Sequence, residues 1–185
     1  QTDFYEPLFF KALAEDGWEV RLFSSGEMDW KPNAYRQVHS FYPLTESRVS
    51  AVLPETVRLL VKGGEHVIGM LQLAARLRRW NPDIIHYQWL PLPFVDVPLM
   101  RLMSRIAPTV LTVHDSTPFQ SAATSPIQRI MAKRGPKSVD KVIVHTDQTK
   151  DEVMSTGVPP KDISIIPHGV IRYPELSEAS SESTD

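Results

Sequence analysis

Short apolar runs alternate with helical patterns along most of this chain of 185 residues, and short connections join them. Runs of β-branched and apolar residues, such as Thr109–Val113 and Lys141–Val144, predict buried strands. Segments in which apolar residues recur every three or four positions, such as Pro54–Trp80, predict helices. This alternation is typical of parallel βαβ units. We therefore expect an α/β fold with a doubly wound parallel sheet and helices on both faces.

The other elements are assigned in the same way. Strands are predicted over residues 18–23, 37–42, 84–87 and 163–166, and helices over residues 4–14, 96–106 and 127–137. Asp96 is expected to cap its helix, with Pro98 in the first turn. Thr149-x-x-Glu152 resembles a capping box near the start of a last helix, which Gly157 ends.

The helix predicted over residues 54–80 has a set of apolar residues on one face, which is typical of the buried side of a helix. These residues are Val57, Leu60, Val61, Ile68, Leu71 and Ala75. We expect Gly63-Gly64, in the middle of this segment, to bend or break the helix.

Composition excludes several classes of protein. A net charge of −2 gives no basic footprint for nucleic acid, and the absence of cysteine excludes disulfides and thiolate metal sites. No run approaches the roughly 18 apolar residues of a membrane span, and the acidic start of the chain does not resemble a signal peptide. We therefore expect a cytoplasmic location. Because the chain opens on Gln1 rather than methionine, we also expect a fragment or a processed form.

Four of the six histidines lie at or just after a predicted strand end: His86, His114, His145 and His168. Ligands of open parallel sheets bind outside the carboxyl ends of the strands, so these positions are candidates for a site. The pair His114-Asp115 is the strongest candidate for catalysis, because histidine exchanges protons near neutral pH and a carboxylate can fix its tautomer. The alternative is that His114 is a core residue and Asp115 caps a helix.

Other strand-end residues also have two interpretations. His86 either lines a ligand crevice or only forms a hydrogen bond within it, and Trp89 either walls a groove or packs on the nearby prolines. Gly169 permits either close approach of the backbone to a ligand or an ordinary turn. We expect no metal site, because the histidines show no tight ligand spacing such as HExxH.

Two clusters of basic residues lie on predicted helices: Arg76, Arg78 and Arg79, and Arg129, Lys133, Arg134 and Lys137. Such clusters either hold a protein against anionic lipid or are simply solvated helix faces. Peripheral contact with the inner face of a membrane is therefore one alternative for this chain.

Four stretches, in this order and spacing, resemble the N-terminal domain of family 4 glycosyltransferases. They are Pro82-Asp83-Ile84-Ile85-His86, Thr109-Val110-Leu111-Thr112-Val113-His114-Asp115, Val139-Asp140-Lys141-Val142-Ile143-Val144-His145-Thr146 and Ile165-Ile166-Pro167-His168-Gly169-Val170. The resemblance spans residues 4–172. It predicts that residues 1–172 form a Rossmann-like, acceptor-side half of a GT-B fold, and that the Ser- and Glu-rich residues 173–185 form a linker or disordered tail.

The resemblance implies a retaining glycosyltransferase of hexosyltransferase type. Such an enzyme transfers a sugar from a nucleotide-sugar to a carbohydrate or lipid-linked acceptor and needs no cofactor or metal. By this resemblance, His114 belongs to the reaction centre, with Asp115 beside it as a possible orienter. The acceptor side of the cleft contains His86, with Gln88 and Trp89 next to it, and His168 and Gly169 lie in a loop near the donor phosphate.

The chain departs from the family in two ways. The family's first strand and Gly-rich loop have no match ahead of residues 4–14, so we expect an interrupted sheet with two unpaired edges. The family's donor-domain Glu-x7-Glu motif also has no match, since Glu19 and Glu27 have that spacing but flank a strand in the wrong half. We therefore expect the chain to lack the C-terminal donor domain and to be inactive alone.

Two rival functions stay open. One is a fragment of a GT-B sugar-nucleotide epimerase, which would need no acceptor. The other is a non-catalytic, Rossmann-like module that binds a protein partner.

Overall fold

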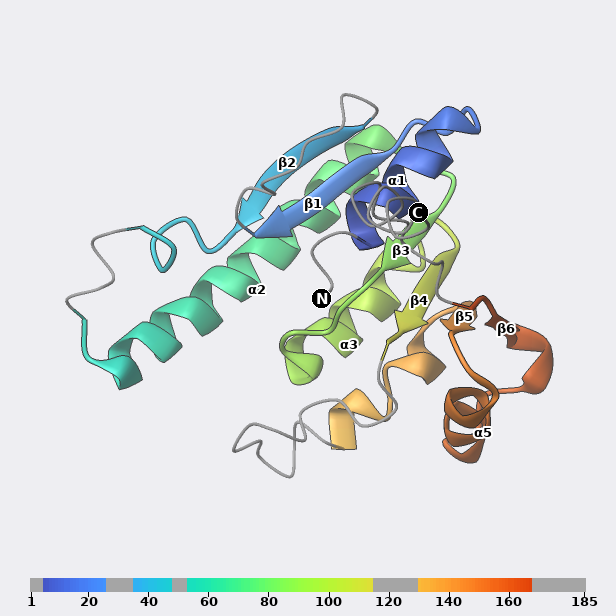
Figure 1. Ribbon diagram of the computed structural model, residues 1–185. Coiled ribbons are helices and arrows are strands. Elements are labelled where there is room, and N and C mark those ends of the chain that lie inside the picture. Colours follow the sequence, from blue (N-terminus) through green and yellow to red (C-terminus); the bar gives the residue numbers. More distant parts are fainter. Residues whose placement is uncertain (1–4, 26–34, 48–52, 115–129, 168–185) are drawn as a thin grey trace, which may run out of the picture. The chain divides into compact units, whose positions relative to one another are not determined.

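The computed structural model describes residues 5–25, 35–47, 53–114 and 130–167 (Figure 1). In chain order the helices and strands are α1 (Tyr5–Glu15), β1 (Arg21–Ser25), β2 (Arg36–Phe41), α2 (Glu55–Trp80), β3 (Ile85–Tyr87), α3 (Pro93–Met103), β4 (Thr109–Val113), β5 (Lys141–Val144), α5 (Asp147–Ser155) and β6 (Ile163–Ile165). Two short 3₁₀ turns, η2 (Pro136–Ser138) and η3 (Pro160–Asp162), precede β5 and β6.

The chain divides into two compact units. The first comprises Gln1–Val20, Met28–Tyr35 and His168–Asp185, and the second comprises Arg21–Glu27 and Arg36–Pro167. In the first unit, the ring of Phe10 on α1 meets the ring of Tyr35 edge-to-face, with centroids 5.7 Å apart. The second unit contains all the described strands, and it holds the candidate site.

The strands of the second unit form two parallel sheets. β1 pairs with β2, and a four-stranded sheet has the order β3-β4-β5-β6. Within the described ranges, no strand bonds to β1 on its other side or joins it to β3. The sheet is thus interrupted where the sequence predicts two unpaired edges. Figure 1 shows β1 and β2 lying over α2, apart from the strands that follow.

Helices cover one face of the four-stranded sheet. The strand register places Ile85, Leu111 and Val142 on the same face. Ile85 packs with residues of α2 and α3, and Val142 packs with Val153 of α5. His86 directly follows Ile85 in β3. It points to the opposite face, because successive side chains of a strand alternate. Parallel strands flanked by helices confirm the Rossmann-like α/β fold class expected from the sequence.

Two details of α2 differ from the sequence prediction. The helix runs without interruption through Gly63 and Gly64. Its buried residues are His66, Gly69, Met70, Leu73, Ala74 and Leu77, a different set from the one expected. The predicted face is instead open to solvent, and Leu60 on it is 77% exposed. Both sets recur at helical spacing, so spacing alone does not distinguish the buried face of α2 from the exposed one.

Two helix starts were also predicted wrongly. α3 begins at Pro93, whose missing N–H costs nothing in the first turn, so Asp96 lies inside the helix rather than at its cap. α5 begins at Asp147, and the side chain of Thr146 caps it by accepting a hydrogen bond from the backbone N–H of Thr149. The predicted end of α5 is confirmed, since Gly157 follows it with φ +96°.

The helical segment predicted over residues 127–137 lies partly outside the described ranges. Residues 130–132 are helical, and the chain then turns into η2. The described helices include none that is both long enough and apolar enough to span a bilayer.

Candidate active site

The candidate site lies along the carboxyl ends of β3, β4 and β5. These strands are parallel and in register, so their ends meet at one edge of the sheet. His86 is the second residue of β3, and His114 and His145 directly follow β4 and β5. The sheet therefore brings together three histidines that are far apart in the sequence.

A chain of hydrogen bonds joins the ends of β3 and β4. The Thr112 hydroxyl lies 2.7 Å from Nε2 of His86, and the Gln88 amide nitrogen lies 3.3 Å from the same imidazole nitrogen. The other end of the amide, Oε1 of Gln88, lies 2.9 Å from Nε2 of His114. Two of the predicted acceptor-side residues, His86 and Gln88, are thus linked to the predicted reaction-centre residue.

Burial sets the charge of the first histidine in this chain. It lowers the pKa of His86 to about 4, because a charged imidazolium is poorly solvated there. His86 is therefore neutral at pH 7, and one of its ring nitrogens accepts hydrogen bonds.

Two aromatic rings lie close to the ring of His114. The indole of Trp89 stacks on its ring with centroids 4.6 Å apart, and the ring of His145 lies 5.2 Å away at a tilt. His145 is buried, and its Nδ1–H donates to the carbonyl oxygen of Ile166, 2.7 Å away. This bond ties the end of β5 to the residue that follows β6.

A second buried cluster supports the loop that carries Gln88 and Trp89. Nε2 of His66 lies 2.5 Å from Oδ1 of Asp96, and the Tyr42 hydroxyl lies 2.7 Å from Nδ1 of the same imidazole. The other carboxylate oxygen of Asp96 accepts from the backbone N–H of Leu92, which ends that loop. Burial, and next the charge of Asp96, raises the pKa of Tyr42 to about 12, so the phenol is a permanent hydrogen-bond donor.

Sequence reasoning missed several of these residues. Thr112 lies within a predicted strand, two positions before His114, so both side chains are on the same face of that strand. His145 lies at a predicted strand end, and pairing β5 with β4 in register places it beside His114. The buried pair of His66 and Asp96 had no sequence signal, because it joins residues 30 positions apart.

Three predicted site residues, Asp115, His168 and Gly169, lie outside the described ranges. Among the described residues, no group of three or more histidines and carboxylates is arranged to hold a metal ion.

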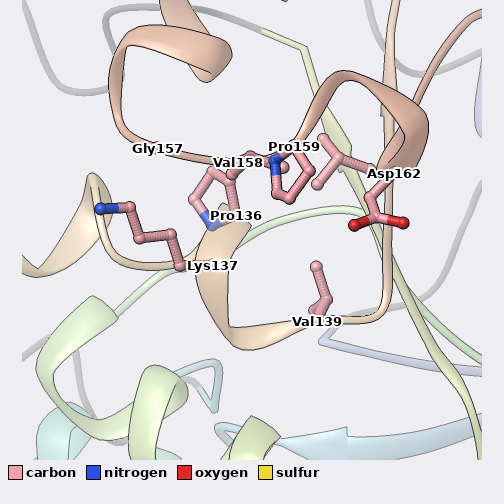
Figure 2. A pocket seen from close by; sticks show the side chains of 8 residues that line it. Pro136, Lys137, Val139, Gly157, Val158, Pro159 and Asp162 are labelled. Atoms are coloured by element: carbon pink, nitrogen blue, oxygen red, sulfur yellow. The ribbon is translucent and has the colours of Figure 1, made fainter.

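A shallow pocket of about 180 Å³ lies elsewhere, beside the amino ends of β5 and β6 (Figure 2). Val139, Val158, Pro159 and Asp162 contribute to its wall. Its volume is below the roughly 300 Å³ at which ligand sites begin, and it is at the wrong edge of the sheet for chemistry. Lys137 reaches toward Gly157 there, near the carboxyl end of α5, where a cation complements the helix dipole.

The edge of the sheet thus offers a neutral imidazole, an amide and a stacked second imidazole. Such groups can hold a polar ligand and stabilise charge that develops on it. No match is found among curated proteins. Residues 9–171, well over half of the chain, match the model of the family described as Glycosyltransferase Family 4. The chain therefore belongs to glycosyltransferase family 4.

Proposed function

We propose that this chain is the acceptor-side domain of a retaining glycosyltransferase that transfers a hexose from a nucleotide-sugar to a carbohydrate or lipid-linked acceptor. Family membership supports glycosyl transfer. The observation that carries the site assignment is the hydrogen-bonded series His86–Gln88–His114 at the carboxyl edge of the parallel sheet. In transfer, the bond between the anomeric carbon and the donor phosphate breaks and its electron pair leaves on the phosphate. The oxygen of an acceptor hydroxyl bonds to that carbon, and the hydroxyl proton passes to the departing phosphate.

In this proposal His114 contacts the donor sugar or stabilises the charge that develops on it, and Asp115 orients it. The exposed indole of Trp89, together with Gln88 and His86, forms the acceptor side of the cleft. His168 and Gly169 lie near the donor phosphate. No metal takes part.

We further propose that a separate donor-binding domain holds the nucleotide, so the 185 residues alone do not turn over. The family's two-domain arrangement supports this division. Within the chain, residues 1–172 would be the acceptor-side domain, and residues 173–185 a linker or tail.

The test assays the 185-residue chain and the complete gene product with labelled nucleotide-sugars and a panel of acceptors. We expect the complete product to form a glycoside whose anomeric proton signal shows retained configuration, and the chain alone to form none. His114→Ala should abolish transfer, while Gln148→Ala on the exposed surface of α5 should leave it unchanged. Near-normal turnover of His114→Ala would refute the assignment of His114.

The same assay separates the rival functions. Conversion of the nucleotide-sugar without any acceptor would identify an epimerase. Absence of turnover by the complete product, together with specific capture of a protein, would favour a binding module.

We also propose peripheral contact with an anionic membrane through the exposed apolar face of α2. Val57, Leu60, Ile68 and Leu71 present large apolar side chains to solvent on this face. The helix ends in Arg78 and Arg79, which would meet lipid phosphates. Sedimentation with vesicles containing about one third phosphatidylglycerol should carry the chain down, and Leu60→Glu should weaken that binding. Equal recovery with and without vesicles would exclude the contact.

A further inference from the structure

The side-chain amide of Gln88 spans two imidazole nitrogens of the same kind. Its Nε2 lies 3.3 Å from Nε2 of His86, and its Oε1 lies 2.9 Å from Nε2 of His114. An amide donates only from its nitrogen and accepts only at its oxygen. Both hydrogen bonds can therefore form only when one of the two imidazole nitrogens carries a proton and the other does not.

The orientation of the amide decides which of the two nitrogens is bare. Its nitrogen, which can only donate, faces Nε2 of His86, so that atom carries the lone pair. The Thr112 hydroxyl, 2.7 Å from the same atom, can donate as well as accept and shares that one lone pair with the amide N–H. The amide oxygen then faces His114 and requires a proton on Nε2 of that ring.

We propose that Gln88 is a positioning residue that forces complementary tautomers on His86 and His114, with the proton on Nε2 of His114. The neutral state of the buried His86 is consistent with this arrangement. The proposal goes beyond the assignment of His114 to the reaction centre, because it names the group that sets the state of its ring.

The tautomer fixes what the second nitrogen of the ring can do. In a neutral His114 with its proton on Nε2, the Nδ1 atom can only accept a hydrogen bond. The stacked indole of Trp89 holds the plane of the ring while it does so.

The coupling can be measured on the 185-residue chain without any turnover. Long-range proton–nitrogen correlation spectra of chain labelled with ¹⁵N-histidine report which nitrogen of each ring carries the proton. His86→Gln and His114→Gln variants assign the signals. We expect a proton on Nε2 of His114 and on Nδ1 of His86. The same nitrogen protonated on both rings, or the reverse assignment, would overturn the proposal.

Variants of Gln88 test whether the amide is the cause. Gln88→Leu removes both hydrogen bonds. Gln88→Asn keeps the amide but withdraws it by one methylene, and it is the second test if the leucine variant fails to fold. In either variant we expect His114 to become a mixture of tautomers, whereas Gln148→Leu on α5 should leave its spectrum unchanged. An unaltered single tautomer of His114 in a folded Gln88 variant would overturn the role of the amide.

Kinetics of the complete gene product separate this proposal from the proposed function. If the tautomers behave as expected, Gln88→Leu should lower kcat roughly 10- to 100-fold through misplacement of His114. Suppose instead that the tautomers are as expected but turnover is unchanged in both Gln88→Leu and His114→Ala. That result would support the tautomer coupling and would exclude His114 from the reaction centre. If His114 keeps its single tautomer in Gln88→Leu, Gln88 does not couple the two rings, whatever turnover is measured.

Discussion

The indole of Trp89 lies nearly parallel to the imidazole of His114, with centroids 4.6 Å apart and planes 16° apart. Trp89 is 47% exposed, so one face of its ring covers the histidine and the rest is open to solvent. The pair joins the loop after β3 to the end of β4. This contact places Trp89 directly beside the residue proposed for the reaction centre.

Removal of this stack should weaken catalysis by the complete gene product. An aromatic pair contributes about 0.5–1.5 kcal/mol beyond burial, so Trp89→Ala should lower kcat/KM between about two- and tenfold. Trp89→Phe keeps a stacking surface and should restore most of the loss. Trp18→Ala, which removes an exposed indole in the other unit, is the matched control. Equal kinetics for Trp89→Ala and the native protein would exclude a role for the stack.

His86 should make the stability of the chain depend on pH. Its pKa falls from 6.5 to about 4 in the folded state, because burial disfavours the charged form. The unfolded chain therefore binds a proton first as pH falls, and stability is lost between about pH 6.5 and pH 4. The loss attributable to His86 is up to about 3 kcal/mol.

Urea denaturation at a series of pH values measures this effect. His86→Gln lacks the titrating group, so its unfolding free energy should fall less than that of the native chain across the same window. Parallel curves for the two proteins would contradict the burial of a neutral His86.

Asp96 should be among the most sensitive buried positions. Asp96→Ala leaves the backbone N–H of Leu92 and the buried His66 without their acceptor. Each buried donor left without an acceptor costs roughly 1–3 kcal/mol, which denaturant unfolding would detect. Asp162→Ala removes a pair with the exposed Lys141 and should cost far less, because solvent screens that pair. Comparable losses in both variants would contradict the distinction.

Two glycines should respond to alanine with opposite signs. Gly157 has φ +96°, and an added Cβ would lie 3.1 Å from Nζ of Lys137, so Gly157→Ala should destabilise the chain by about 1–2 kcal/mol. Gly63 lies inside α2, and apart from the helix's own backbone no described atom lies within 4 Å of an added Cβ there. Gly63→Ala should therefore stabilise by about 0.5–1 kcal/mol. Thermal unfolding of the two variants should show melting temperatures that move apart.

Local patterns predicted the strands of the four-stranded sheet well. β4 and β5 were predicted to the residue, because β-branched runs there are bounded by polar residues and the core dictates their length. The helix starts at Pro93 and Asp147 were missed, because a proline in the first turn and a threonine cap earlier in the chain compete with the expected cap at Asp96 and the expected capping box at Thr149.

Parallel topology allowed part of the candidate site to be predicted. The rule that strand ends share an edge selects His86 and His114 from the sequence alone. It could not supply the partners of these rings, because Thr112 and His145 become neighbours only through strand register. The buried face of α2 was also beyond local reasoning, since two apolar sets compete on one helix and tertiary packing chooses between them.

Among the described strands, β1 and β2 bond only to each other, and side chains attach the pair to α2. Phe23 and Phe41 pack on the core below it, and the guanidinium of Arg21 lies 4.4 Å from the ring centroid of Trp80. A two-stranded sheet is marginal by itself, so this pair should open locally before the rest of the molecule unfolds. Its amide hydrogens should then exchange with deuterium sooner than those of β4 and β5. The first opening event would thus leave the row of histidines in place.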